Sequence, residues 1–329
     1  MRGIDDLGGS LGDDPLLLRE HLLESLDERW KAYRKAVKRC RKRASEQSVH
    51  HLRVETRRLL STLELLSYLS NTVQLRKAHQ SLKKQLDAFD DLRDTHVQLL
   101  YTATMLRDFP ELKRLVKRLE RREKSLIKPA AQTARRSKLK RLSRRISATK
   151  SHLKVAFAKT GVLHSTELAG TVALPAAPAG RFRPAVRLAQ AVQRAFNRVT
   201  ELRHQIDPAR LETIHRTRIA FKRFRYMIEL LQPILPAVPP RQLISMDQYQ
   251  TIKGEIQDIS VMIERLDALL QKKKFKDLPL QRFRQVLLQR RERLVQGYLN
   301  VADQLFTFWP DNRVRRTPRP SQPVAAHAI

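Results

Sequence analysis

Two segments of the sequence carry a histidine followed by cations at helical spacing. Arginine dominates both segments, and its planar guanidinium group can grip phosphate oxygens through paired hydrogen bonds. The chemistry these residues offer is therefore the binding of phosphate-rich anions. The first cationic stripe consists of His50, Arg53, Arg57 and Arg58, and the second of His215, Arg218, Lys222, Arg223 and Arg225.

Each stripe lies opposite an apolar face when its segment is drawn as a helix. The cationic face carries almost one sign of charge, with Glu55, Glu64 and Glu229 as the exceptions. A solvated helix face normally mixes charges to limit repulsion, so this pattern favours a polyanion-binding surface over an ordinary exposed face. The apolar residues expected in the core are Leu52, Leu59, Leu63 and Leu66 in the first segment, and Phe221, Phe224, Ile228 and Leu231 in the second.

The histidines and two downstream acids have more than one possible role. His50 and His215 lead the stripes, where each either contacts the anion or braces the arginines. Asp94 and Asp258 would repel an anion, so we expect each to pair with an arginine and fix its rotamer. No set of ligands for a metal or a cofactor is recognised, and neither a Gly-rich phosphate loop nor a catalytic triad pattern occurs. The sequence therefore predicts a protein that is not an enzyme.

The charge balance points to the same class of partner. The 329 residues include 66 Lys and Arg against 33 acids, a net charge of +33. Such self-repulsion favours a bound polyanion, and nucleic acid, an anionic membrane and polyphosphate are the candidates. A single cysteine, Cys40, excludes an intramolecular disulfide framework. We expect no membrane span and a cytoplasmic location, and the oligomeric state stays open.

Helical periodicity runs through most of the chain, and no alternating strand pattern appears, so the expected fold is all-α. Residues 1–15 and 309–329 have the composition of disordered ends, and 161–180 reads as a linker that has lost charge and periodicity. The expected helices are 16–46, 48–69, 73–107, 110–127, 130–159, 182–205, 209–233, 240–271 and 277–308.

The sequence pattern of the first half repeats in the second half. His215 lies 165 residues after His50, and the cations that follow match at the same offset. Asp94 and Asp258 lie at similar distances downstream of the two histidines. We therefore predict an internal duplication, with two four-helix bundles formed by 16–160 and 181–308 and related by a pseudo-two-fold axis.

These motifs resemble those of the CHAD domain, the conserved histidine α-helical domain. Residues 49–59 (VHHLRVETRRL) and 214–229 (IHRTRIAFKRFRYMIE) resemble its two signatures, and 93–97 (RDTHV) and 254–258 (GEIQD) its third-helix patterns. The resemblance covers about residues 15–308. It implies two four-helix bundles in a pseudo-two-fold arrangement, binding of inorganic polyphosphate and association with polyphosphate granules.

Two alternatives remain beside a polyphosphate binder. The same cations suit the backbone of DNA or RNA, although base-stacking aromatic residues are scarce near the stripes. A role as an accessory to an enzyme of phosphate metabolism is the third. Competition between long-chain polyphosphate and duplex DNA separates the first two.

Overall fold

The computed structural model describes residues 14–167, 183–235, 238–271 and 280–309, and within these ranges the chain is helical and has no strand. The all-α prediction is confirmed. In chain order the helices are α2 (Pro15–Lys42), α3 (Glu46–Ser67), α4 (Val73–Asp87), α5 (Asp90–Thr104), η1 (Pro110–Leu112), α6 (Lys113–Arg136), α7 (Leu139–Glu167), α8 (Arg183–His204), α9 (Leu211–Leu231), η2 (Gln232–Ile234), α10 (Pro240–Leu270), α11 (Gln281–Val301) and η4 (Ala302–Thr307).

Side-chain caps fix where the first helices begin. Asp14 accepts hydrogen bonds from the backbone N–H groups of Leu16 and Leu17, at 2.9 and 3.0 Å, and so starts α2. Ser45 and Thr72 cap α3 and α4 in the same way. Each cap satisfies donors that a helix N-terminus leaves without an intrahelical partner.

One helix was expected over 73–107, but the structure has two, because the helix is interrupted between α4 and α5. Phe89 occupies the break with its side chain only 1% exposed, and Asp90 and Asp91 open the first turn of α5. Acidic side chains at this position interact favourably with the helix dipole. Since no proline or glycine occurs in 73–107, the periodicity gave no sign of the break.

The break expected at Pro129 is absent, and α6 continues through it to Arg136. Pro129 lies on the exposed side of α6, where a carbonyl left without its helical donor can bond to water. The helix ends instead at Ser137. Arg41 of α2 holds this turn by donating to the carbonyls of Ala134 and Ser137, at 2.9 and 2.8 Å.

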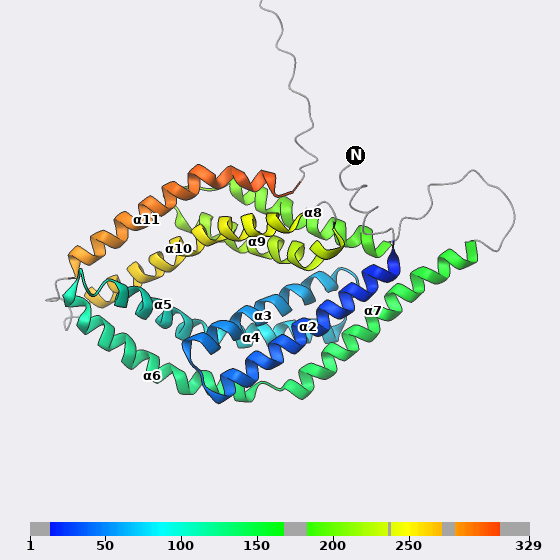
Figure 1. Ribbon diagram of the computed structural model, residues 1–329, viewed down its shortest axis with the longest axis horizontal. Coiled ribbons are helices and arrows are strands. Elements are labelled where there is room, and N and C mark those ends of the chain that lie inside the picture. The colour runs from blue at the N-terminus through cyan, green and yellow to red at the C-terminus, as the bar shows by residue number, and fades with distance from the viewer. Residues whose placement is uncertain (1–13, 168–182, 236–237, 272–279, 310–329) are drawn as a thin grey trace, which may run out of the picture.

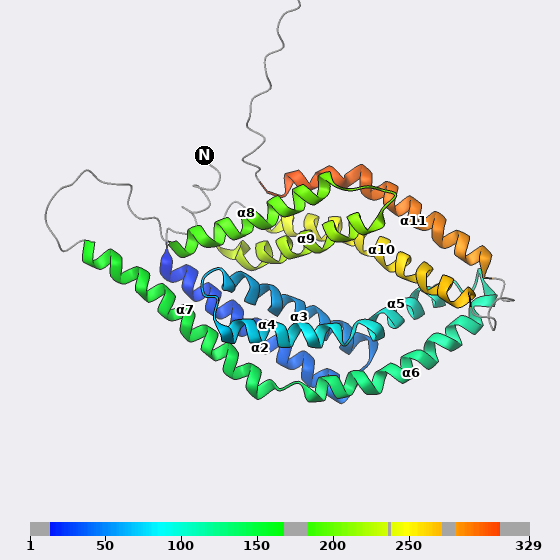
Figure 2. The same ribbon diagram turned by 180° about the vertical axis from the view of Figure 1, so that it is seen from behind.

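The helices pack in two groups that meet along α3 and α9. Helices α2, α3, α4 and α7 pack together, as do α8, α9, α10 and α11, and the two groups meet where α3 contacts α9 (Figures 1 and 2). Helix α5, which belongs to neither group, contacts α10. The pair α5 and α6 reaches away from the first group, and its apolar residues share a second core cluster with α10 and α11. This packing places α5 and α6 outside a compact four-helix bundle. The duplication and the pseudo-two-fold axis stay predictions.

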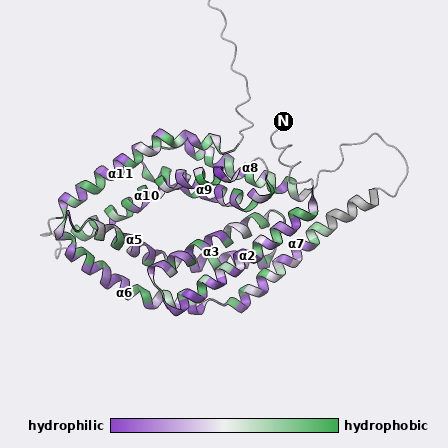
Figure 3. Ribbon diagram, in the orientation of Figure 1, coloured by the Kyte–Doolittle hydropathy of each residue, from purple (hydrophilic) through white to green (hydrophobic). Residues whose placement is uncertain are grey.

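The apolar faces expected from the sequence line the main core. Hydrophilic and hydrophobic residues alternate along the helices, as Figure 3 shows, which is typical of amphipathic helices. The eight apolar residues predicted to face the core are at most 1% exposed: Leu52, Leu59, Leu63, Leu66, Phe221, Phe224, Ile228 and Leu231.

The predicted boundaries of the halves differ in detail from the helices. Trp309 was assigned to the disordered C-terminal tail, but it is 3% exposed, and its indole N–H donates to Gln193 at 2.9 Å. Helix α7 continues through Glu167, well into the predicted linker. The rest of the predicted linker and both predicted ends, save for Asp14, Pro15 and Trp309, lie outside the described residues. None of the described helices is long and apolar enough to cross a membrane.

Candidate functional site

The two predicted stripes lie on α3 and α9, the helices through which the two groups meet. Their buried leucines and phenylalanines fix the rotation of each helix about its own axis. The cations on the remaining faces are thereby brought near one another, although they lie far apart in the sequence.

Three of these cations crowd together and are half-buried. Burial and the charge of neighbouring Arg53 lower the pKa of Arg57 to about 10. Burial and the charges of Arg57 and Arg218 lower the pKa of Lys222 to about 6. Burial also lowers the pKa of Arg218, against the opposing charge of Asp258. Like charges held this close raise each other's free energy. We call Arg57, Arg218 and Lys222 the central cations.

Acidic residues do not neutralise this group fully. In the part of the chain that the structure describes, neither Arg57 nor Lys222 forms an ion pair. The ammonium of Lys222 lies 5.9 Å from the ring centre of Tyr226, which offers only a weak cation–π contact. The Nε of Arg218 is buried and has no hydrogen-bond acceptor within the described residues. The central cations therefore keep donors and charge that an anion can use.

The arginines that flank the central cations are neutralised across the helix contact. Arg58 lies 3.1 Å from Glu55 and 3.5 Å from Glu229, and Arg223 lies 2.6 Å from Glu64. The pairs Arg58–Glu229 and Glu64–Arg223 are reciprocal, because the offset of 165 that links the stripes relates Arg58 to Arg223 and Glu64 to Glu229. The three acids that interrupted the cationic faces thus partner the flanking arginines.

Two further predicted binding residues already have acid partners. Arg53 is 4% exposed, and its guanidinium lies 2.7 Å from Asp90 and donates to the Leu86 carbonyl at 3.0 Å. It was expected on the open face, but the end of α4 and the start of α5 cover it. Arg225 pairs with Asp247 of α10.

The leading histidines occupy different environments. His50 is exposed, whereas His215 is half-buried and its Nδ1 has no hydrogen-bond partner among the described residues. Burial, with the charge of Arg218 adding to it, lowers the pKa of His215. His215 therefore lies beside Arg218 of the central cations, whereas His50 is exposed to solvent. The described residues contain no cluster of His, Cys, Asp and Glu suited to a metal ion.

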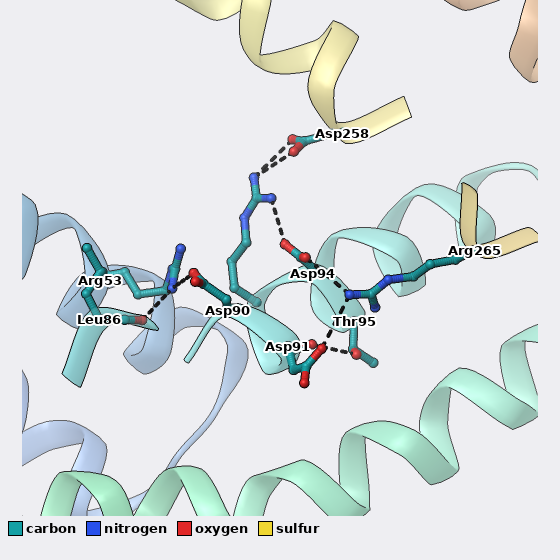
Figure 4. Close-up of polar contacts among 9 residues, drawn as sticks. Arg53, Leu86, Asp90, Asp91, Asp94, Thr95, Asp258 and Arg265 are labelled. Carbon is teal, nitrogen blue, oxygen red and sulfur yellow. Dashed lines mark hydrogen bonds and ion pairs between the residues drawn. The ribbon is translucent and has the colours of Figure 1, made fainter. Parts of the chain in front are cut away.

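The two downstream acids, Asp94 and Asp258, pair with arginines outside the stripes. Arg93 lies 3.1 Å from Asp94 and 2.8 Å from Asp258, and Arg265 lies 3.2 Å from Asp94 (Figure 4). These contacts join α5 to α10, and we call them the arginine–aspartate bridge. The sequence motif contained Arg93 but gave no sign that it would be the partner of both acids.

A buried lysine lies behind the central cations and was not expected. Lys253 of α10 is 1% exposed, and its Nζ lies 3.9 Å from the ring centre of Tyr249 and 4.3 Å from that of Phe221. Burial and the charge of Arg218 hold its pKa well below the usual range. The next residue, Gly254, places its backbone against Arg218, since an added Cβ would lie 3.5 Å from the guanidinium. In the sequence Lys253 looked like one more surface charge.

Known proteins share this helical arrangement. The chain matches the crystal structure of the CHAD domain from the plant Ricinus communis with a TM-score of 0.54 and 19% identity, over 88% of this chain and 90% of that one. It matches PptA from Streptomyces chartreusis with a TM-score of 0.57 and 16% identity, over 88% of this chain and 99% of that one. At these identities the likeness shows the fold alone. No curated protein sequence matches the chain.

The family model of the CHAD domain matches residues 21–267. This range contains both stripes, the arginine–aspartate bridge and Lys253, and it ends within α10. The resemblance had been expected to extend to about residue 308, so α11 lies beyond the matched range. Since the model spans most of the sequence, this chain belongs to the CHAD domain family.

Proposed function

We propose that this chain binds inorganic polyphosphate at the central cations and catalyses no reaction. The observation that carries the proposal is the absence, within the described residues, of an acid partner for Arg57 and Lys222, although both are half-buried among like charges. A phosphate chain would supply the missing negative charge and accept hydrogen bonds from the free donors.

The remaining predicted residues would extend or order this surface. Five of them border the central cations and, in this proposal, contact the polyphosphate where it extends beyond those cations: His50, His215, Arg58, Arg223 and Arg225. Arg53 acts through its position, because its contact with Asp90 fixes the start of α5 beside Arg57. A chain of repeating phosphates suits such a row of cations because each successive phosphate meets another donor.

The state of the carboxylates supports binding over hydrolysis. A metal-dependent phosphatase needs carboxylates that converge on a metal and the reacting phosphate. Here Asp94 and Asp258 accept hydrogen bonds from arginines of the bridge instead. Binding without turnover would bring the chain to polyphosphate granules.

The test compares two double variants of the full chain for their affinity for long-chain polyphosphate. At pH 5, where Lys222 carries its charge, Arg57→Gln with Lys222→Gln removes the unpaired charges, and Lys117→Gln with Lys124→Gln removes the same charge from exposed positions on α6. The first variant is expected to bind about 100-fold more weakly, since each charged hydrogen bond contributes about 1.5–3 kcal/mol. The α6 variant should bind nearly as well as the unchanged chain.

The salt dependence supplies a second readout. The slope of log affinity against log salt should become shallower by about 0.7 for each phosphate contact removed, the value for single-stranded nucleic acids. Equal losses of affinity and slope in both variants would contradict the proposed location, because they would mean that only the overall charge matters.

A further inference from the structure

A second cationic region lies at the junction of α6 and α7, away from α9. It surrounds a cavity of about 350 Å³ whose lining comes from α2, α4, α6 and α7. Figures 1 and 2 show α7 on the far side of α2 and α4 from α9. We call this cavity the α6–α7 pocket. Its lining includes the cations Lys84, Arg136, Lys138, Arg141 and Arg145, and no acid.

One wall of the α6–α7 pocket has a fixed shape, because it is formed by a turn that contacts from α2 hold in place. Arg41 donates to the carbonyls of Ala134 and Ser137 and so sets the angle between α6 and α7. Helix α7 begins at Leu139, so the positive end of its dipole adds to the field of the cations. A shallower hollow lined by Arg41, Lys140 and Arg144 adjoins the pocket and shares Arg141 with it.

Buried polar atoms in the wall have no partner in the described part of the chain. Tyr33 is fully buried and donates its hydroxyl hydrogen to Oε1 of Gln85, which leaves the amide N–H₂ of Gln85 as the free end. That Nε2 is buried without an acceptor, and so is Oγ of Ser137. Unpaired buried donors cost free energy, and a ligand that accepts hydrogen bonds would remove the cost.

The cations of the pocket are also left without acids. Arg145 donates to the Lys77 carbonyl at 2.8 Å and to the Ser81 hydroxyl at 2.7 Å, and neither partner is charged. Desolvation and the charge of Arg141 lower the pKa of Arg145. Within the residues described, Lys84, Arg136 and Lys138 form no ion pair either.

We propose that the α6–α7 pocket binds a short phosphoanhydride, a diphosphate or triphosphate group. A single phosphate would leave most of the cations uncompensated, whereas a pocket of about 350 Å³ suits a small ligand and not a long chain. Guanidinium, ammonium, amide and hydroxyl donors on several walls match the many oxygens of such a group. The group comes either from a free inorganic anion or from a nucleotide. This site is independent of the central cations.

Calorimetric titration of the full chain with four probes tests the proposal. The probes are pyrophosphate, triphosphate, ADP and ATP, with orthophosphate and sulfate as simple anions for comparison. The titrations use the unchanged chain and the Arg57→Gln, Lys222→Gln variant, so that loss of the central site is separated from loss of the pocket. One site for a phosphoanhydride should remain in that variant.

Variants of the pocket complete the test. Lys84→Gln with Lys138→Gln changes two exposed residues that have no ion pair in the described chain, so folding should be retained. Arg141→Gln with Arg145→Gln probes the wall formed by α7, and circular dichroism checks the folding of this variant. Either pair should weaken phosphoanhydride binding about tenfold or more, while leaving the affinity for long-chain polyphosphate at the central cations nearly unchanged.

The titrations distinguish a free phosphoanhydride from a nucleotide, and two results would overturn the proposal. Binding of both triphosphate and ATP shows that the anhydride group itself is recognised; binding of ATP alone makes a nucleotide the ligand. Equal affinity for sulfate, orthophosphate and triphosphate would overturn the proposal, because the pocket would then hold simple anions only. Unchanged affinity in the folded pocket variants would overturn it as well.

Discussion

The central cations and the arginine–aspartate bridge use the same residue types in opposite ways. In the bridge, Arg93 contacts Asp94 and Asp258, so each charge has a partner across α5 and α10. At the contact of α3 and α9, Arg57 and Lys222 face other cations, and the described chain gives them no acid. Paired arginines hold the helices together, whereas unpaired cations cost stability and leave binding capacity. The two regions should therefore respond oppositely to the loss of charge.

The largest expected effect follows from charge reversal at the central cations. Arg57→Glu with Lys222→Glu should weaken polyphosphate binding by about 1,000-fold or more, since it removes two contacts and adds repulsion. The thermal midpoint should not fall, because repulsion among cations is relieved. Binding titrations and thermal melts measure the two effects. Reversal of Arg93 and Arg265 in the bridge should show the reverse pattern, and a loss of stability at the central cations instead would contradict the comparison.

Removal of one acid from the bridge should cost stability and spare binding. Asp258→Asn leaves Arg93 with one carboxylate fewer, so the free energy of unfolding should fall by about 1–3 kcal/mol. It also removes the acid that opposes the lowering of the pKa of Arg218, so polyphosphate affinity should hold or rise. Urea unfolding measures the first effect, and a titration the second. Unchanged stability together with lost binding would make Asp258 part of the ligand site.

Lys253, the buried lysine next to Arg218, should cost stability as the unpaired central cations do. Because the folded pKa of Lys253 lies well below its unfolded value near 10.4, the unfolded chain binds the proton more readily and stability falls as pH drops below about 10. Lys253→Met should therefore raise the free energy of unfolding at pH 7 by about 1–2 kcal/mol, the range seen when buried charged groups are replaced by apolar ones.

The comparison of the two chains over pH gives the control for that prediction. The unfolding curves of Lys253→Met and of the unchanged chain should converge as pH rises above about 10. Destabilisation by Lys253→Met at every pH would mean that the aromatic rings hold a charged lysine to advantage.

The smallest effect concerns the pH dependence of binding. With a pKa of about 6, Lys222 is neutral at pH 8 in the free protein and gains its charge as pH falls through 6. Polyphosphate affinity should therefore rise several-fold between pH 8 and pH 5, with proton uptake on binding at pH 8. Lys222→Met should remove most of this rise, whereas His50→Gln should leave it in place. An unchanged pH profile in Lys222→Met would assign the titration to a histidine.

The sequence predicted the core and the direction of the cationic faces, because both follow from helical spacing. Leu59 and Phe224 are buried as expected, and that burial alone turns Arg57 and Lys222 away from the core. Spacing cannot show what a neighbouring helix will cover. Arg53 shares the arc of Arg57 on a helical wheel, yet the break at Phe89 places Asp90 over it.

Charge pairing between distant segments was equally hidden. Glu64 and Glu229 looked like exceptions within single faces, and only the contact of α3 with α9 brings each to an arginine of the other helix. The helix break predicted at Pro129 was wrong for a related reason. A proline on the exposed side of a helix leaves a carbonyl that water can satisfy, so the helix can continue. Residue types gave the chemistry, whereas the choice between paired and unpaired charge depended on tertiary packing.

Competition between long-chain polyphosphate and duplex DNA at physiological salt tests the central claim most directly. Fluorescent polyphosphate bound to the full chain is challenged with DNA at equal phosphate concentration. The close group of Arg57, Arg218 and Lys222 suits a flexible chain that can follow it, so polyphosphate should remain bound. Displacement of polyphosphate by DNA would contradict the proposed function and make nucleic acid the ligand of this surface.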